Sequence, residues 1–186
     1  MSTDITVIEV PVPKGVRFQL QGTTLLAQGP LGATRRPFPA DAIELTPGDA
    51  QVTLTLRLPA HRRKSRALLR SWEAHVRNLA GGLTTGVEAK MKIVAAHFPM
   101  KVAAKGEELV IENFLGEKHP RTAPLRAGTK AVVDGEFVIL SGNDVEQVGQ
   151  SAANIERATH IRDYDPRVFQ DGIYLVEHAH LKEASE

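Results

Sequence analysis

Apolar and polar residues alternate along much of the chain, with the period of two that half-buried β-strands produce. The clearest runs are "IELTPGDAQVTLTLRL", which begins at Ile43, and "KAVVDGEFVILSG", which begins at Lys130. Each run predicts two strands around a turn that contains glycine, and the Asp134-Gly135 pair is a strong hairpin signal. The pattern therefore favours small antiparallel sheets.

Two segments have helical periodicity instead. The first runs from about residue 63 to residue 80, and Gly81-Gly82 is predicted to end it. The second runs from about residue 144 to residue 161, with Asn143 as a predicted N-cap and Glu146 completing a capping box. The apolar stripes are Leu68, Leu69, Trp72, Val76 and Leu79 in the first helix and Val145, Val148, Ala152, Ile155 and Ala158 in the second.

The two halves of the chain also resemble each other. Without gaps, the segment from Gln19 aligns with the segment from Ala103, and Gly29 falls on Asn113. Both of those residue types tolerate a left-handed backbone. The "GPLG" run at 29–32 has the spacing of an RNA-clamping loop, but we interpret it as a turn. The matched positions are Gly22 with Gly106, Leu25 with Leu109, Leu31 with Leu115, and Gly32 with Gly116.

These patterns predict an α+β protein made of two tandem copies of a small, mostly antiparallel sheet with one helix packed on one face. The expected parts are an N-terminal unit at 1–82, a C-terminal unit at 83–178 and a frayed polar tail at 179–186. The second unit is expected to add a leading strand at 87–98 and a closing turn and strand at 167–178.

Charge is distributed unevenly along the 186 residues, although the net charge is only +1. The chain up to Gly82 carries 11 Lys and Arg against 6 Asp and Glu, whereas the rest carries 12 against 16. The cluster "HRRKSRALLR" at 61–70 indicates either an anionic partner or a solvated helix face, and both interpretations stay open.

The sequence offers little for catalysis. It has no cysteine, which excludes disulfides and thiol chemistry, and no nucleotide-loop or hydrolase motif. His178 and His180 lack an evident third metal ligand. Neither a signal peptide nor an apolar run of membrane-spanning length is apparent, so we expect a soluble, cytoplasmic protein without cofactor.

Cationic loop residues are the groups best suited to binding. Lys118, His119 and Arg121 follow a glycine in a segment stiffened by Pro120 and Pro124. Such groups match RNA phosphates and 2′-hydroxyls, and stiff loops lose less entropy on binding. Further candidates surround the end of the second helix, namely Arg157, His160, Arg162, Arg167 and Gln170.

Four motifs, "HFPMKV", "VIENFLGEKHPR", "VGQSAANIERAT" and "RVFQDGIY", resemble the archaeal and eukaryotic branch of the large-subunit ribosomal protein L-six family. The resemblance is strongest from Leu83 to Val176. It implies two sheet-plus-helix units and a structural, non-enzymatic protein that binds large-subunit rRNA chiefly through the C-terminal unit. The implied place is near the base of the factor-binding stalk and the sarcin-ricin loop, beside other ribosomal proteins and translation factors.

The resemblance, together with the charge argument, gives a set of expected RNA-binding residues. Asp171 is expected to organise its loop instead, because a bare carboxylate beside phosphate is unfavourable. His119 and Pro120 depart from residues that the family often has there. The expected contacts are Lys118, His119, Arg121, Asn154, Arg157, Arg162, Arg167, Gln170 and Tyr174.

Two other functions compete with RNA binding. A protein-binding module could use an open sheet edge or the basic helix. A small hydrolase could use Asp163, Asp165 and Asp171, although Arg162 and Arg167 nearby would satisfy those carboxylates. No nucleophile or cofactor motif supports the hydrolase, and RNA binding is the favoured interpretation.

Overall fold

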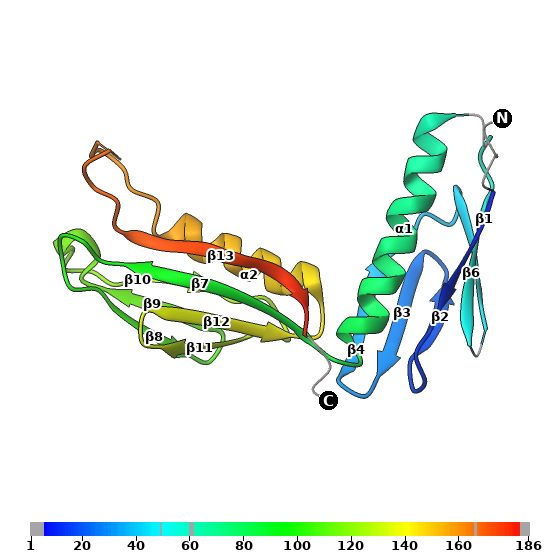
Figure 1. Cartoon of the computed structure of the whole chain (residues 1–186), viewed down its shortest axis with the longest axis horizontal. Helices are drawn as coiled ribbons and strands as arrows, with labels where there is room; N and C mark the ends of the chain where they lie inside the picture. The colour runs from blue at the N-terminus through cyan, green and yellow to red at the C-terminus, as the bar shows by residue number, and fades with distance from the viewer. Residues whose placement is uncertain (1–5, 49, 60–61, 166, 183–186) are drawn as a thin grey trace. The chain divides into compact units, whose positions relative to one another are not determined.

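The computed structural model describes residues 6–48, 50–59, 62–165 and 167–182. The chain divides into two compact units, unit 1 at Met1–Thr85 and unit 2 at Gly86–Glu186 (Figure 1). The division falls within the segment 81–86.

Unit 1 consists of two three-stranded antiparallel sheets and one helix. The sheets have the strand orders β1-β6-β5 and β2-β3-β4. Leu69, Trp72 and Val76 of the helix pack into a core with the buried residues of both sheets. The elements are β1 (Val7–Pro11), β2 (Arg17–Gln21), β3 (Thr24–Gly29), β4 (Gly32–Pro37), β5 (Ile43–Pro47), β6 (Gln51–Leu56) and α1 (Arg63–Gly82).

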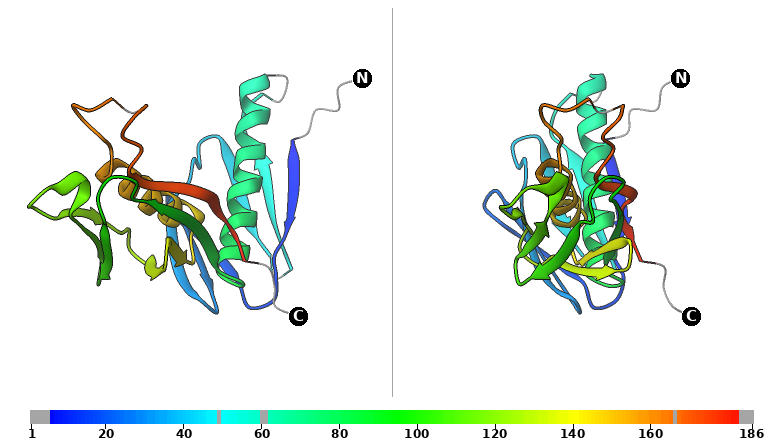
Figure 2. Two further views of the ribbon diagram at one scale, coloured as in Figure 1. Left: turned by 60° about the vertical axis from the view of Figure 1, so that its left-hand side comes forward. Right: turned by 90° about the vertical axis from the view of Figure 1, so that its left-hand side faces the viewer.

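Unit 2 has a three-stranded sheet in the order β10-β9-β8 and a four-stranded sheet in the order β11-β12-β7-β13. Helix α2 packs on strands of both sheets, as the two views of Figure 2 let the reader follow. The elements are β7 (Val87–Val94), β8 (Lys101–Lys105), β9 (Glu108–Glu112), the 3-10 turn η1 (Phe114–Gly116), β10 (Arg121–Pro124), β11 (Lys130–Asp134), β12 (Phe137–Gly142), α2 (Val145–Ala158) and β13 (Gly172–Leu181).

The internal repeat and the α+β class are confirmed, with one correction. Strand β1 pairs with β6 just as β7 pairs with β12, so the leading strand of unit 2 has a counterpart in unit 1. The alternation that marks β1 is short, since Ile8 and Val10 are its two buried residues and Pro11 follows at once, so this strand was not predicted from the sequence. Within the described residues, β13 is the strand of unit 2 that unit 1 does not match.

The helix ends differ from their predicted positions. Helix α1 includes the predicted stop Gly81-Gly82 in its last turn and has Leu83 as its C-cap, and a left-handed glycine follows only at Gly86 (φ 86°). Helix α2 is capped by Asp144, not Asn143, because the extended Asp144 carboxylate accepts a hydrogen bond from the Glu146 backbone N–H at 2.9 Å.

The aligned glycines have two different physical roles. Gly22 and Gly106 form equivalent left-handed turns, with φ of 61° and 62°. Asn113 is left-handed as predicted (φ 60°), but its partner Gly29 is not. Glycine is needed at position 29 because a Cβ there would lie 2.8 Å from the Leu83 Cβ. The "GPLG" run is the turn between β3 and β4, as predicted.

The expected tail is partly ordered in the sheet. Strand β13 continues to Leu181, so residues 179–181 belong to the sheet rather than to a frayed tail. Lys182 also pairs with Glu88, with an N–O distance of 3.0 Å. Residues 183–186 of that predicted tail lie outside the described residues. Within the described part of the chain, no helix combines the length and apolar character of a membrane span.

The close approach at Gly29 generates a stability prediction. Gly29→Ala is expected to destabilise unit 1 by about 1–3 kcal/mol, because the added methyl group must displace Leu83. Trp72, the chain's one tryptophan, is buried in unit 1, so its fluorescence during urea denaturation measures the effect. Gly149→Ala in α2 of unit 2 is the control, since its Cβ would lie 3.9 Å from Ala179. An unchanged Trp72 midpoint in Gly29→Ala would contradict the prediction.

Candidate nucleic-acid interface

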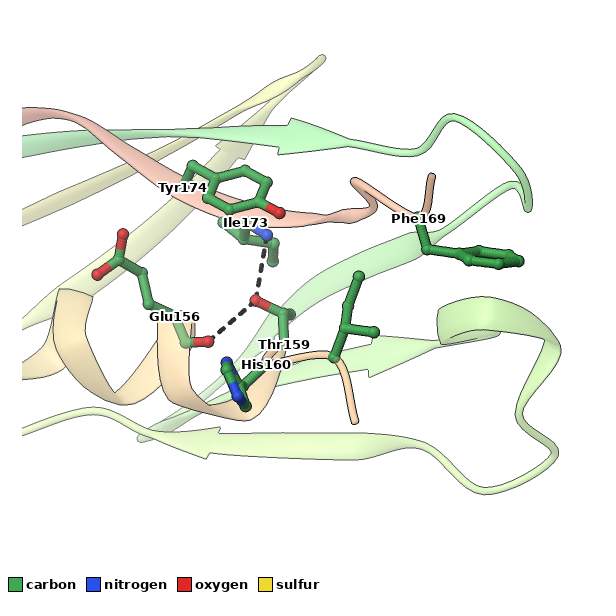
Figure 3. A pocket seen from close by; sticks show the side chains of 7 residues that line it. Glu156, Thr159, His160, Phe169, Ile173 and Tyr174 are labelled. Atoms are coloured by element: carbon green, nitrogen blue, oxygen red, sulfur yellow. Dashed lines mark hydrogen bonds between the residues drawn. The ribbon is translucent and has the colours of Figure 1, made fainter. Parts of the chain in front are cut away.

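The C-terminal end of α2 is joined to the first residues of β13 through the buried Thr159 (Figure 3). The Thr159 hydroxyl accepts a hydrogen bond from the Ile173 backbone N–H at 3.1 Å and lies 3.3 Å from the carbonyl oxygens of Ile155 and Glu156. In addition, the Glu156 Oε1 accepts from the Leu175 backbone N–H at 3.0 Å. The side chains of Glu156 in α2 and of its C-cap Thr159 therefore hold β13 in place.

Arg121 joins the loop at 113–120 to the same helix end. Its Nε and Nη2 donate to the two oxygens of Glu117 at 2.8 and 2.6 Å. Its Nη1 donates to the carbonyl oxygens of Ala158 and His160 at 2.8 and 3.1 Å. A cation is favourable at a helix C-terminus, where unpaired carbonyls carry partial negative charge. The hydrogen bond from Arg121 also lowers the pKa of Glu117.

Asn154 has a similar internal role. Its side-chain Nδ2 donates to the carbonyl oxygen of Pro124 at 2.9 Å, and its Oδ1 accepts from Gln150 Nε2 at 3.1 Å. The end of β10 is thus fixed against α2.

The loop itself has an unusual backbone. Asn113, Leu115 and Gly116 have φ of 60°, 49° and 78°, and left-handed conformations are costly for a leucine. The Asn113 side chain donates to the Pro99 carbonyl oxygen at 2.9 Å. These backbone conformations and the Asn113 hydrogen bond restrict the shape of the loop. Lys118 and His119 are exposed on it.

Asp171 organises the loop that precedes β13, as the sequence analysis expects. Its side chain is 2% exposed and accepts from the His97 backbone N–H at 2.9 Å, and its Oδ2 lies 2.6 Å from the His97 Nδ1. Burial alone would raise the pKa of Asp171. Hydrogen bonds from the His97 backbone and side chain, the His97 charge and the Ala96 backbone N–H outweigh this effect, so the net pKa is lowered. The His97 ring also packs on Phe169, at 4.6 Å between centroids.

Several basic side chains near the C-terminal end of α2 line a hollow of about 360 Å³. Arg157 and Arg162 line it with Arg121 and His160, and neither of the first two pairs with a carboxylate among the described residues. The structure thus brings Arg121, Arg157 and Arg162 of the predicted set together. Arg167 is exposed in the loop before β13, outside this hollow.

Other groups around α2 were missed in the sequence analysis. The i,i+4 spacing of the Glu117–Arg121 pair is visible in the sequence. The partners of the Thr159 and Glu156 side chains are backbone N–H groups, which any residue type supplies, so these contacts leave no pattern in the sequence. Gln170 contributes its carbonyl oxygen, which accepts from the Tyr174 hydroxyl at 3.1 Å.

The remaining candidate groups are held in local turns and strands. Asp165 accepts from the Arg167 backbone N–H at 2.9 Å, and Asp163 adopts a left-handed turn (φ 64°). The His180 Nδ1 lies 2.8 Å from the His178 carbonyl oxygen. Within residues 6–48, 50–59, 62–165 and 167–182, no group of three or more His, Cys, Asp or Glu is arranged to hold a metal ion.

The basic segment at 61–70 lies at the start of α1, and His61 is outside the described residues. Arg70 and Arg77 pair with Glu73, each at 2.7 Å. Arg62 and Arg63 are exposed. The alternative interpretations of this segment both remain predictions.

Asp171→Asn is expected to lower the free energy of unfolding of unit 2 by about 1.5–3 kcal/mol near neutral pH, because a charged hydrogen-bond acceptor is lost. Since folding lowers the pKa of Asp171, its stabilisation is complete above the ordinary value of 3.8 and is lost as pH falls through the lowered pKa. The difference between wild type and variant should therefore shrink in acid. Urea denaturation at several pH values, followed through NMR signals of β13, measures it.

The exposed Asp165 provides the control for this experiment. Asp165→Asn is expected to change stability by less than about 0.5 kcal/mol, because its exposed side chain accepts a hydrogen bond from a solvent-exposed backbone N–H, which the asparagine oxygen can also accept. A stability difference between wild type and Asp171→Asn that stays constant into acid would contradict the role given to Asp171.

Comparison with known proteins identifies the family. The family model for ribosomal protein L6 matches residues 98–172. The large ribosomal subunit protein uL6 of Methanobrevibacter smithii is 43% identical over 168 residues, which cover 90% of this chain and 93% of the relative. The protein of the same name from Methanosarcina mazei is 43% identical over 172 residues, which cover 91% and 96%.

These relatives are structural ribosomal proteins and not enzymes, which confirms the prediction that the chain has no catalytic activity. The identity extends over both units, so it includes the first half, where the motif resemblance is looser. The chain therefore belongs to the archaeal-type L6 family of ribosomal proteins and is a constituent of the large ribosomal subunit.

Proposed function

We propose that the chain binds large-subunit rRNA chiefly through unit 2, with the cations around the C-terminal end of α2 as its backbone contacts. The observation that carries the proposal is the hollow lined by Arg157 and Arg162, whose charges have no carboxylate partner among the described residues. Phosphate oxygens are the natural partners of such guanidinium groups. Family membership supports RNA as the source of these phosphates.

The expected contacts divide into two groups by their internal bonding. Arg121 already donates four hydrogen bonds, which leaves one of its five N–H donors, and Asn154 donates to Pro124. We assign both to holding the loops rather than to binding phosphate. The residues that face the RNA in this proposal are Lys118, His119, Arg157, Arg162, Arg167, Gln170 and Tyr174.

The resemblance of the four motifs also supports a location within the subunit. In this proposal unit 2 lies near the base of the factor-binding stalk and the sarcin-ricin loop. Neighbouring ribosomal proteins and translation factors are then close by, and the protein functions on cytoplasmic ribosomes.

Salt dependence tests the phosphate contacts. Each of Lys118→Gln, Arg157→Gln and Arg162→Gln is expected to reduce the slope of log affinity against log salt by about 0.7–0.9, because one fewer phosphate is neutralised. The measurement is filter binding of the full chain to large-subunit rRNA of Methanosarcina mazei over a range of salt concentrations.

Lys105→Gln is the matched control, because it removes the same charge at the far end of β8. Lys105 lies about 13 Å along this strand from Lys101, which pairs with Glu112 near η1. Its slope should equal that of wild type. Arg121→Gln should weaken binding with an unchanged slope, because its charge is already paired with Glu117. If the three contact variants keep the wild-type slope, the proposed phosphate contacts are wrong.

A further inference from the structure

A second hollow, of about 420 Å³, shares His160 with the basic hollow. Figure 3 shows its walls, with Ile173 and Tyr174 from β13, and Glu156, Thr159 and His160 at the end of α2. We propose that this hollow receives one unstacked RNA base and prefers guanine. The proposal rests on the proposed function for its ligand class, and it names the nucleotide that the site takes.

Tyr174 forms a rigid aromatic wall of this hollow. Its side chain is 46% exposed, yet its hydroxyl donates to the Gln170 carbonyl oxygen at 3.1 Å. The ring lies against Gly172, where a Cβ would come within 3.0 Å of the ring atom Cζ. Glycine therefore lets the ring lie close to the backbone and keep an exposed face. Single-stranded RNA is commonly bound by stacking unpaired bases on such aromatic faces.

Much of the hollow's lining is apolar or has its hydrogen bonds already satisfied. Ile161 and Ile173 contribute apolar atoms, and the Thr159 hydroxyl already bonds the Ile173 backbone N–H. The volume of about 420 Å³ falls within the roughly 300–1,000 Å³ typical of small-molecule sites. A flat ring system fits this environment better than a bare phosphate, which would lose its hydration there.

Glu156 supplies the polar group that can distinguish bases. Its Oε1 accepts from the Leu175 backbone N–H, while no hydrogen bond within the described part of the chain reaches its Oε2. A carboxylate repels phosphate but accepts from N–H groups. Guanine presents two adjacent N–H donors, N1–H and the N2 amino group, on one edge. Uracil presents a single N–H between two carbonyl oxygens, which the carboxylate repels.

The neighbouring basic hollow completes a site for a whole nucleotide. Arg157 and Arg162 line the basic hollow, and His160 lines both hollows. The nucleotide that places its base beside Tyr174 can place its phosphate toward these guanidinium groups. The ligand class is thus a guanylate unit of a single-stranded RNA segment.

The first test uses ¹H–¹⁵N NMR spectra of the full chain titrated with 5′-GMP and, separately, 5′-UMP. GMP is expected to shift the backbone signals of Thr159, His160 and Ile173, with an affinity roughly tenfold higher than that of UMP. Glu156→Gln should abolish this preference, because the amide oxygen can still accept from Leu175 while the amide nitrogen donates instead of accepting. Tyr174→Leu should weaken both nucleotides.

The outcomes separate this inference from the proposed function. No GMP-dependent shifts in these signals, or equal GMP and UMP affinities in the wild type, would overturn the guanine site. The rRNA salt titration of wild type and Arg157→Gln is run in parallel. If Arg157→Gln reduces the rRNA salt slope while GMP produces no shifts, the base site is wrong and the phosphate contacts stand. If Arg157→Gln leaves the salt slope unchanged and GMP produces no shifts, both proposals fail. Unchanged spectra elsewhere in the variants show that unit 2 remains folded.

Discussion

The bidentate and backbone hydrogen bonds of Arg121 are the contacts on which the outer loops of unit 2 depend. One guanidinium group connects Glu117 in the loop, the Phe114 ring beneath it and the last carbonyl oxygens of α2. A planar group with five donors can make this set of contacts, whereas a lysine ammonium cannot reproduce the geometry. The loop and the helix end consequently form one body, and the side chains that project from them keep fixed positions.

The acidic groups of unit 2 explain how a half of the chain with net negative charge can present a cationic surface. Glu117 is bound to Arg121, and Asp171 is buried against His97. The Glu117 charge is balanced by Arg121 and the Asp171 carboxylate is buried, so neither offers much negative charge to a partner. Net charge summed over a segment therefore says little about the potential at one end of a helix, because the geometry decides which charges cancel.

Local signals predicted most of the fold. The Asp134-Gly135 hairpin and the turns at Gly22 and Gly106 follow from backbone preferences that neighbouring residues determine. The start of α2 was misplaced because Asn143 and Asp144 are both good caps, and only the observed backbone distinguishes them. The role of Arg121 was beyond prediction, because its partners at and just after the end of α2 are carbonyl oxygens 37 and 39 residues away, which any residue type would supply.

Strand β13 distinguishes unit 2 from unit 1. The duplicated scaffold comprises the strands β1 to β6 with α1 and the strands β7 to β12 with α2, and β13 stands outside it. Ile173 and Tyr174 therefore have no counterpart in the described part of unit 1, although α1 and its sheets repeat the rest. The repeated framework is thus common to both units, and the side chains of β13 give unit 2 a surface that this framework alone does not supply.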